Sequence, residues 1–169
     1  TQVDVEVATV ISDADMLIRR GRLIEAQELL AGNYRRSPRQ DGAIEELIVL
    51  AEDTRLRAYY ETALSLEQDF RFEQAIVAYD ELLLEAEGYF DDALTRRDTL
   101  ADYVDKATRW YAAAEDARGT PEELAYLRRI DIVYPEYRDV VERIEALEAA
   151  EDAQFEALES LGAIDASNP

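Results

Sequence analysis

The sequence predicts an all-α protein, a solenoid of antiparallel helical hairpins with about three units of alternating short and long helices. Three observations carry this prediction. Apolar residues recur three and four positions apart along most of the 169 residues, which is the spacing of one helix face. Gly or Pro interrupts the pattern where one helix would end and another begin. A similar short segment also returns about every 49 residues, a period typical of stacked helical repeats.

The N-terminal segment is ambiguous between two secondary structures. Valines in residues 3–7 alternate with acids in the period of a strand, but no later segment offers a partner strand. Ser12 followed by Asp15 is the pattern of a capping box that would open a helix. We expect a helix that ends near Arg20 and begins at Ser12 or, with a frayed start, as early as Asp4.

Three short helices are expected after breaks in the helical pattern. Gly21 ends the first helix, and Pro38 is expected to stop the next one. Thr120 offers a capping hydroxyl to the third short helix, and Pro121 suits its first turn. The face of the first short helix comprises Leu23, Ala26, Leu30 and Tyr34. The second covers Phe72 to about Glu85, and the third covers Pro121 to Tyr134.

Long helices are expected in the intervals between the short ones, over residues 41–68, 91–118, and 137 or 138 to about 161. The first of them is apolar on more than one side, as in a helix that packs between two neighbours. Together the helices make one repeat domain over residues 1–162, followed by a C-terminal tail over residues 163–169.

The short helices and their corners repeat with a nearly constant spacing. Ala26 and Ala75 are 49 positions apart, and Leu124 follows after another 49. The corner positions Pro38, Glu87 and Pro135 lie 49 and 48 apart, and Tyr89-Phe90-Asp91 is matched with Tyr137-Arg138-Asp139. One hairpin cannot bury its apolar face alone, so the units are expected to stack.

In the first short helix, a small residue is followed four positions later by a bulky one, after a Gly and before a Pro. In the second, Phe70 stands where the Gly would be and Glu87 where the Pro would be, and in the third, Leu124 or Glu123 replaces the small residue. The matching residues are Gly21, Ala26, Leu30 and Pro38, then Phe70, Ala75, Tyr79 and Glu87, then Gly119, Leu124 or Glu123, Leu127 and Pro135. This pattern resembles the tetratricopeptide repeat (TPR) family, although its period is longer than the family's period of about 34 residues. The resemblance implies a right-handed superhelix whose groove binds a peptide or protein segment.

The net charge of −21 disfavours nucleic acid and anionic membranes as partners, because both would be repelled. Residues 1–40 contain six acids and six arginines, so all of the excess lies beyond residue 40. We expect a protein or peptide partner with a basic patch, or a second copy of the chain that supplies one. The alternative is that the acids only form a solvated surface that keeps the chain soluble.

The sequence gives little support for catalysis, because carboxylate pairs such as Asp91-Asp92 are expected by chance in a chain with 39 acids. It has no His or Cys, no Gly-rich phosphate loop and no serine in a nucleophile motif. The acid spacing also lacks the central Gly and final Glu of a calcium loop. We therefore expect a protein that is not an enzyme and has no cofactor and no metal site.

Aromatic residues on the long helices are the candidate partner-binding residues. Exposed Trp and Tyr side chains anchor interfaces, and Tyr103 and Trp110 share one helix edge beside Arg109. The full set of candidates is Tyr59, Tyr60, Tyr103, Arg109, Trp110 and Tyr111. The alternative is that the tyrosines are half-buried packing residues with hydrated hydroxyl groups.

The last long helix offers a second candidate interface. Its apolar stripe comprises Val140, Ile144, Leu147, Leu158 and Leu161, with Phe155 alongside, and its other side is acidic. One interpretation is that this helix caps the array. The other is that it meets the arginine-bearing first hairpin of another copy, giving head-to-tail assembly.

The sequence thus favours a non-catalytic interaction or scaffold module that binds a peptide or protein segment of basic character. The alternative is a structural spacer or oligomerisation segment of a larger, envelope-associated assembly. A binder should present an apolar or aromatic groove, whereas a spacer should bury its aromatics and use its ends. Because the chain begins at Thr1 rather than Met, we expect a processed protein of the bacterial periplasm or the ectodomain of an anchored protein, with the cytoplasm as the alternative.

Overall fold

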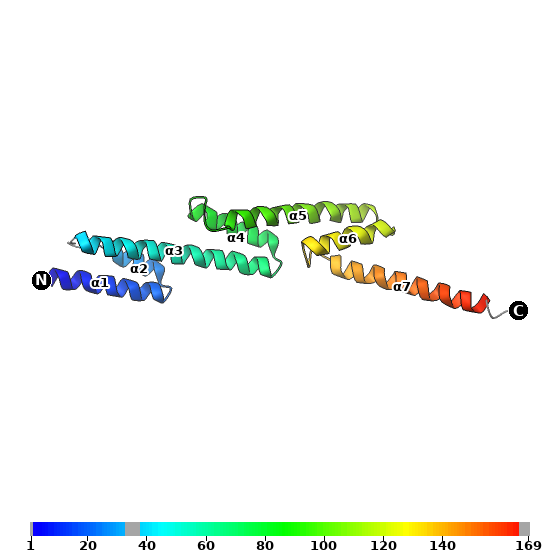
Figure 1. Cartoon of the computed structure of the whole chain (residues 1–169), viewed down its shortest axis with the longest axis horizontal. Helices are drawn as coiled ribbons and strands as arrows, with labels where there is room; N and C mark the ends of the chain where they lie inside the picture. Colours follow the sequence, from blue (N-terminus) through cyan, green and yellow to red (C-terminus); the bar gives the residue numbers. More distant parts are fainter. Residues whose placement is uncertain (1, 33–37, 166–169) are drawn as a thin grey trace. The chain divides into compact units, whose positions relative to one another are not determined.

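The computed structural model describes the backbone of residues 2–32 and 38–165 and the side chains of residues 5–32 and 40–161. Over these residues the chain is all-α, with seven helices and no strand, which confirms the predicted class (Figure 1). The helices are α1 (Gln2–Arg19), α2 (Leu23–Leu30), α3 (Pro38–Gln68), α4 (Phe72–Glu85), α5 (Ala93–Asp116), α6 (Pro121–Val133) and α7 (Val140–Asp165).

Helix α1 is continuous, so the strand alternative and the helix start at Ser12 are both wrong. Its buried side chains are Val7, Val10, Ala14 and Ile18, which follow one another at helical spacing. This spacing continues through Ser12, which is exposed in the middle of the helix. The helical spacing of the buried residues therefore determines the secondary structure of this segment, and the local alternation of valine and acid does not.

Helix α2 ends at Leu30, well before Pro38, so Pro38 does not stop it. Pro38 is instead the first residue of α3, a position where Pro costs no backbone hydrogen bond. Ala26 and Leu30 of the expected face are buried, whereas Tyr34 lies outside the described residues. Helix α4 begins and ends at the predicted residues.

The turns before α2 and α4 are two copies of one structure. Gly21 has φ 72° and Phe70 has φ 55°, so both lie in the left-handed region. In each turn the next residue donates its N–H to a carbonyl five positions back, from Arg22 to Leu17 and from Arg71 to Leu66, at 2.9 Å in both. Phe70 therefore occupies the position of a turn glycine, as the repeat alignment predicts.

The corners before α5 and α7 are also copies of one another, but their spacing differs from the sequence alignment by one residue. Asp91 (φ 43°) corresponds to Arg138 (φ 52°), and both lie in the left-handed region. The buried residue before each is Phe90 in one corner and Tyr137 in the other. Positive φ at Asp91 and Arg138 explains why α5 and α7 begin two residues later than these positions.

The start of α6 is where the sequence predicts it, but a different side chain completes it. Thr120 stands at the N-cap with an extended backbone, yet its hydroxyl donates to the Ala117 carbonyl at 2.8 Å instead of capping the helix. Glu123 accepts a hydrogen bond from the Gly119 N–H at 2.8 Å. Both candidates for the small-residue position, Glu123 and Leu124, are buried.

The chain divides into two compact units. Unit 1 consists of residues 1–65 and 77–94, and unit 2 consists of residues 66–76 and 95–169. In unit 1, α1, α2 and α3 share two apolar clusters, one built on Val7, Ala14, Leu30 and Ile44 and the other on Ile18, Ala26 and Ala51. In unit 2, the ring of Phe72 stacks on Tyr134 with centroids 4.3 Å apart. Each unit therefore has its own core.

Candidate functional site

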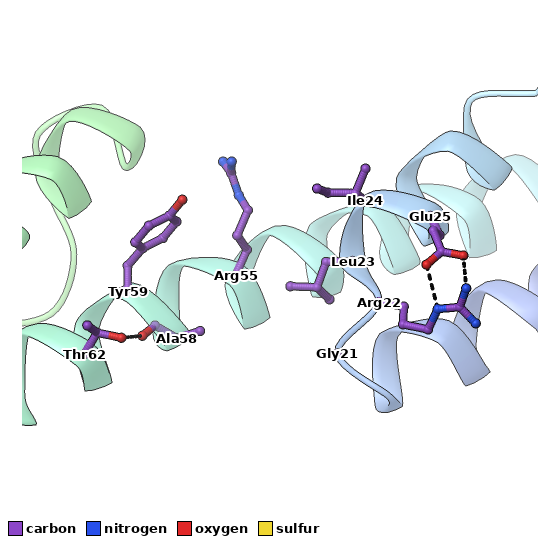
Figure 2. Close-up of a pocket in the computed structure, with 9 residues that line it drawn as sticks. All are labelled: Gly21, Arg22, Leu23, Ile24, Glu25, Arg55, Ala58, Tyr59 and Thr62. Atoms are coloured by element: carbon purple, nitrogen blue, oxygen red, sulfur yellow. Dashed lines mark hydrogen bonds and ion pairs between the residues drawn. The ribbon is translucent and has the colours of Figure 1, made fainter.

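A groove in unit 1 contains one of the sequence-predicted residues, Tyr59. We name it the Tyr59 groove; it has a volume of about 460 Å³ and is lined by Gly21, Arg22, Leu23, Ile24, Glu25, Arg55, Ala58, Tyr59 and Thr62 (Figure 2). Arg55 and Thr62 each lie three or four positions from Ala58 and Tyr59, so the α3 residues share one helix face. The turn at Gly21 brings the start of α2 beside that face.

The lining of the Tyr59 groove is apolar, with a rim of paired charges. Ile24 is 70% exposed and Tyr59 is 41% exposed, both high values for residues of this kind. Figure 2 shows the side chains of Ile24, Arg55 and Tyr59 on the same side of the ribbon. Such a surface can accept large apolar side chains from a partner.

Both arginines of the rim are paired within the chain. Arg22 forms a bidentate ion pair with Glu25, in which Nε donates to Oε1 at 2.6 Å and Nη2 donates to Oε2. Arg55 lies 3.0 Å from a carboxylate oxygen of Glu85 and 3.8 Å from one of Glu52. These arginines neutralise the negative charge of the carboxylates around them, in a protein whose net charge is strongly negative.

Tyr60, the neighbour of Tyr59, packs inside unit 1 instead of facing the groove. Its hydroxyl donates to Asp92 Oδ1 at 2.5 Å, and its ring centroid lies 5.8 Å from that of Phe90 and 6.1 Å from that of Tyr79. Tyr60 therefore holds α3 against the corner that opens α5.

Tyr111 repeats this arrangement in unit 2. Its hydroxyl donates to Asp139 Oδ1 at 2.7 Å. The centroid of the Tyr111 ring lies 5.8 Å from that of Tyr137 and 4.7 Å from the Arg138 guanidinium. The hydrogen bond to Asp139 raises the pKa of Tyr111, and burial adds to this shift. The same hydrogen bond lowers the pKa of Asp139, although burial acts in the opposite direction. Tyr60 and Tyr111 are thus equivalent residues that join a long helix to the next corner.

The remaining candidates lie on α5 in unit 2. Tyr103 is half-buried, with its ring centroid 6.2 Å from that of Phe72. Trp110 is half-buried, and the exposed Arg109 pairs with Asp105 at 2.7 Å. The structure therefore places Tyr59 and Tyr60 in unit 1 and the other four candidates in unit 2. The partner-binding role of all six stays a prediction.

The groove also contains residues that the sequence reasoning missed. Ile24 directly follows Leu23 and lies off the stripe formed by Leu23, Ala26 and Leu30, so it could have been noticed as an apolar residue without a place in the core. Arg55 gave no such signal, because its pairing with Glu85 depends on a residue of another helix.

A second exposed surface lies on the C-terminal part of α7. We name it the α7 distal face, and it comprises Phe155 (64% exposed), Leu158 (68%) and Leu161 (63%). Every residue from Ala149 to Leu161 is exposed, whereas Val140 near the start of the helix is buried. The six acids from residue 144 to residue 161 are Glu145, Glu148, Glu151, Asp152, Glu156 and Glu159, with no basic residue among them. The α7 distal face is thus an apolar strip on an acidic helix.

Other site types are not found in the described part of the chain. No group of three or more His, Cys, Asp or Glu side chains in it is arranged to hold a metal ion. None of its helices is long and apolar enough to cross a membrane.

Comparison with known proteins gives no relative. No family model matches the chain, and no curated protein or solved structure matches it.

Proposed function

We propose that this chain is a non-catalytic protein-interaction module, built as a right-handed superhelical solenoid of about three TPR-like hairpins, that binds a protein segment of basic character. The equivalent turns at Gly21 and Phe70 and the equivalent corners at Asp91 and Arg138 support a repeated hairpin. The alternation of shorter and longer helices from α2 to α7 supports it as well.

The α7 distal face is the observation that carries the proposed binding function. Three large apolar side chains that are about two-thirds exposed on one helix segment are costly to leave in water, and such patches mark interaction sites. The acids around them attract a partner of opposite charge and repel acidic competitors. A basic amphipathic segment satisfies both requirements.

The composition of the chain supports a role without catalysis. His and Cys, the residues most often used for proton transfer near neutral pH and for thiolate chemistry, are absent from the sequence. Asp and Glu are abundant, but in a chain with 39 of them close pairs arise by chance. Binding alone accounts for the residues that are present.

A titration with two synthetic helical peptides tests this function. The intact chain is titrated with a Lys/Leu amphipathic peptide and with its Glu/Leu counterpart, and binding is followed by calorimetry. We expect binding of the basic peptide only, weakened by salt, and at least about tenfold weaker for Leu158→Ser because apolar burial is lost. Ala153→Ser, on another side of α7, is the matched control. Equal binding of both peptides, or of the two variants, would contradict the proposal.

A structural spacer or oligomerisation segment is the second candidate, because several aromatics are used for internal packing. Tyr60 and Tyr111 bind the chain's own aspartates, and the ring of Tyr103 contacts Phe72. A spacer is expected to bury its aromatics in this way and to make its contacts through its ends. Self-association of the intact chain separates this candidate from a binder of foreign segments.

A further inference from the structure

We propose that the α7 distal face of one copy docks in the Tyr59 groove of a second copy, so that the chain assembles head to tail. This inference rests on the proposed binding function of the α7 distal face and names its partner. Each copy carries one groove and one face, and each surface is exposed in the single chain.

The two surfaces match in their apolar residues. The groove offers Ile24, Tyr59 and the half-buried Leu23, and its volume of about 460 Å³ leaves room for large side chains. Phe155 and Leu158 lie three positions apart on α7 and therefore on the same side of the helix. Docking removes exposed apolar surface from both partners at once, which is the main favourable contribution to such an interface.

The charges of the two surfaces match as well. The α7 segment bears six acids and no base from residue 144 to residue 161, so the acidic remainder of another copy repels it. Residues 1–40 have a net charge of zero and provide Arg22 in the lining of the groove, where Arg55 of α3 also lies. This arginine-bearing region is therefore the part of a second copy best suited to an acidic helix.

Arg22 in the groove lining can exchange its present partner for an acid of α7. Arg22 pairs with Glu25, and the side chains of Arg22 and Glu25 are 53% and 49% exposed. Exposed pairs of this kind contribute little to stability, so the cost of exchanging them is small. The contact joins two different surfaces, and such a contact continues into a ring or an open filament.

Two variants, each blocked on one surface, test the assembly by sedimentation equilibrium of the whole chain. Ile24→Glu blocks the groove and Leu158→Glu blocks the α7 distal face. The unmodified chain should form species larger than a dimer as its concentration rises, and less so at high salt. Each variant alone should be a monomer. Their equimolar mixture should form a one-to-one dimer, because one intact groove and one intact face remain.

Ala153→Glu is the matched control, because it adds the same charge to α7 away from the apolar strip; it should assemble like the unmodified chain. A monomeric unmodified chain that binds the Lys/Leu peptide through Leu158 overturns this inference and leaves the proposed function in place. A mixture of the two variants that stays monomeric also overturns the inference. Loss of peptide binding and of assembly together would refute both.

Discussion

Gly21 and Gly42 occupy two different backbone environments, a left-handed turn and a helix. Gly21 has φ 72°, which L side chains rarely adopt, whereas Gly42 lies inside α3. A Cβ added at either position meets nothing within 4 Å, so packing does not separate the two cases. Only backbone conformation does.

The Gly→Ala change should therefore have opposite signs at these two positions. Gly21→Ala should lower the free energy of unfolding by about 1 kcal/mol, because the left-handed conformation is strained with a Cβ. Gly42→Ala should raise it by about 0.5 to 1 kcal/mol, because Ala loses less backbone entropy in a helix. Urea unfolding followed by circular dichroism measures both, and changes of the same sign would contradict the prediction.

The hydroxyl groups of Tyr60 and Tyr111 should contribute to stability, unlike that of Tyr59. Tyr60→Phe and Tyr111→Phe each remove a hydrogen bond to an aspartate and keep the ring, so each should cost about 1 kcal/mol. Tyr59→Phe, in the exposed groove, is the control and should change the free energy of unfolding by less than about 0.5 kcal/mol. If all three substitutions have the same effect, the pairing of Tyr with Asp carries no stability.

The contrast between Tyr59 and Tyr60 shows how far the sequence could predict the site. Both were candidates as adjacent aromatics on one helix, and successive residues point about 100° apart. Which of them faces water depends on where Phe90 and Asp92 lie, some 30 positions later in the chain. Residue type and local period contain no such information, so the groove could not be placed before the structure was known.

At the scale of single helices, prediction succeeded where local signals agreed. Helix α4 has apolar residues at helical spacing and turn residues at both ends, and its bounds were predicted correctly. The start of α1 was left open between Ser12 and Asp4, and the predicted end of α2 was wrong, because local signals conflicted. Valine alternation suggested a strand, and Pro38 fits the end of one helix as well as the start of the next. Tertiary burial of Val7 and Ala14 decided the first case.

Helices α6 and α7 are joined by a buried ion pair that should make stability depend on pH. Arg143 contacts Glu123 and Glu115, and Glu123 is only 4% exposed. Burial acts to raise the pKa of Glu123, but hydrogen bonds from Arg143 and Gly119 outweigh it, so that pKa is lowered on balance. The corresponding contacts raise the pKa of Arg143 despite its burial, so it stays charged throughout.

Because the folded pKa of Glu123 lies below its unfolded value, its stabilisation is present above the unfolded value and is lost as the pH falls through the folded value. Glu123→Gln should therefore cost about 1 to 3 kcal/mol at pH 7 and progressively less in acid. Glu145→Gln, on the exposed surface of α7, should leave the pH profile unchanged. Parallel profiles for Glu123→Gln and the unmodified chain would contradict this account.

For the whole molecule, the net charge of −21 should make stability rise with salt. Like charges repel one another in the compact state, and salt screens that repulsion. The Leu158→Glu variant is suited to this measurement, because self-association should not contribute to its melting temperature. We expect that temperature to rise between about 0.01 M and about 0.15 M sodium chloride. A fall would mean that favourable ion pairs outweigh the repulsion.

The composition of the two units has a consequence for how the gene can be divided. Unit 1 needs both residues 1–65 and residues 77–94, while the eleven residues from Leu66 to Ile76 belong to unit 2. No single cut of the chain leaves both units complete, and any cut between residues 66 and 94 leaves both of them unfinished. Truncation and module exchange, which work well in arrays with contiguous repeats, should therefore fail within this interval, so the segment has to be kept intact when the protein is engineered.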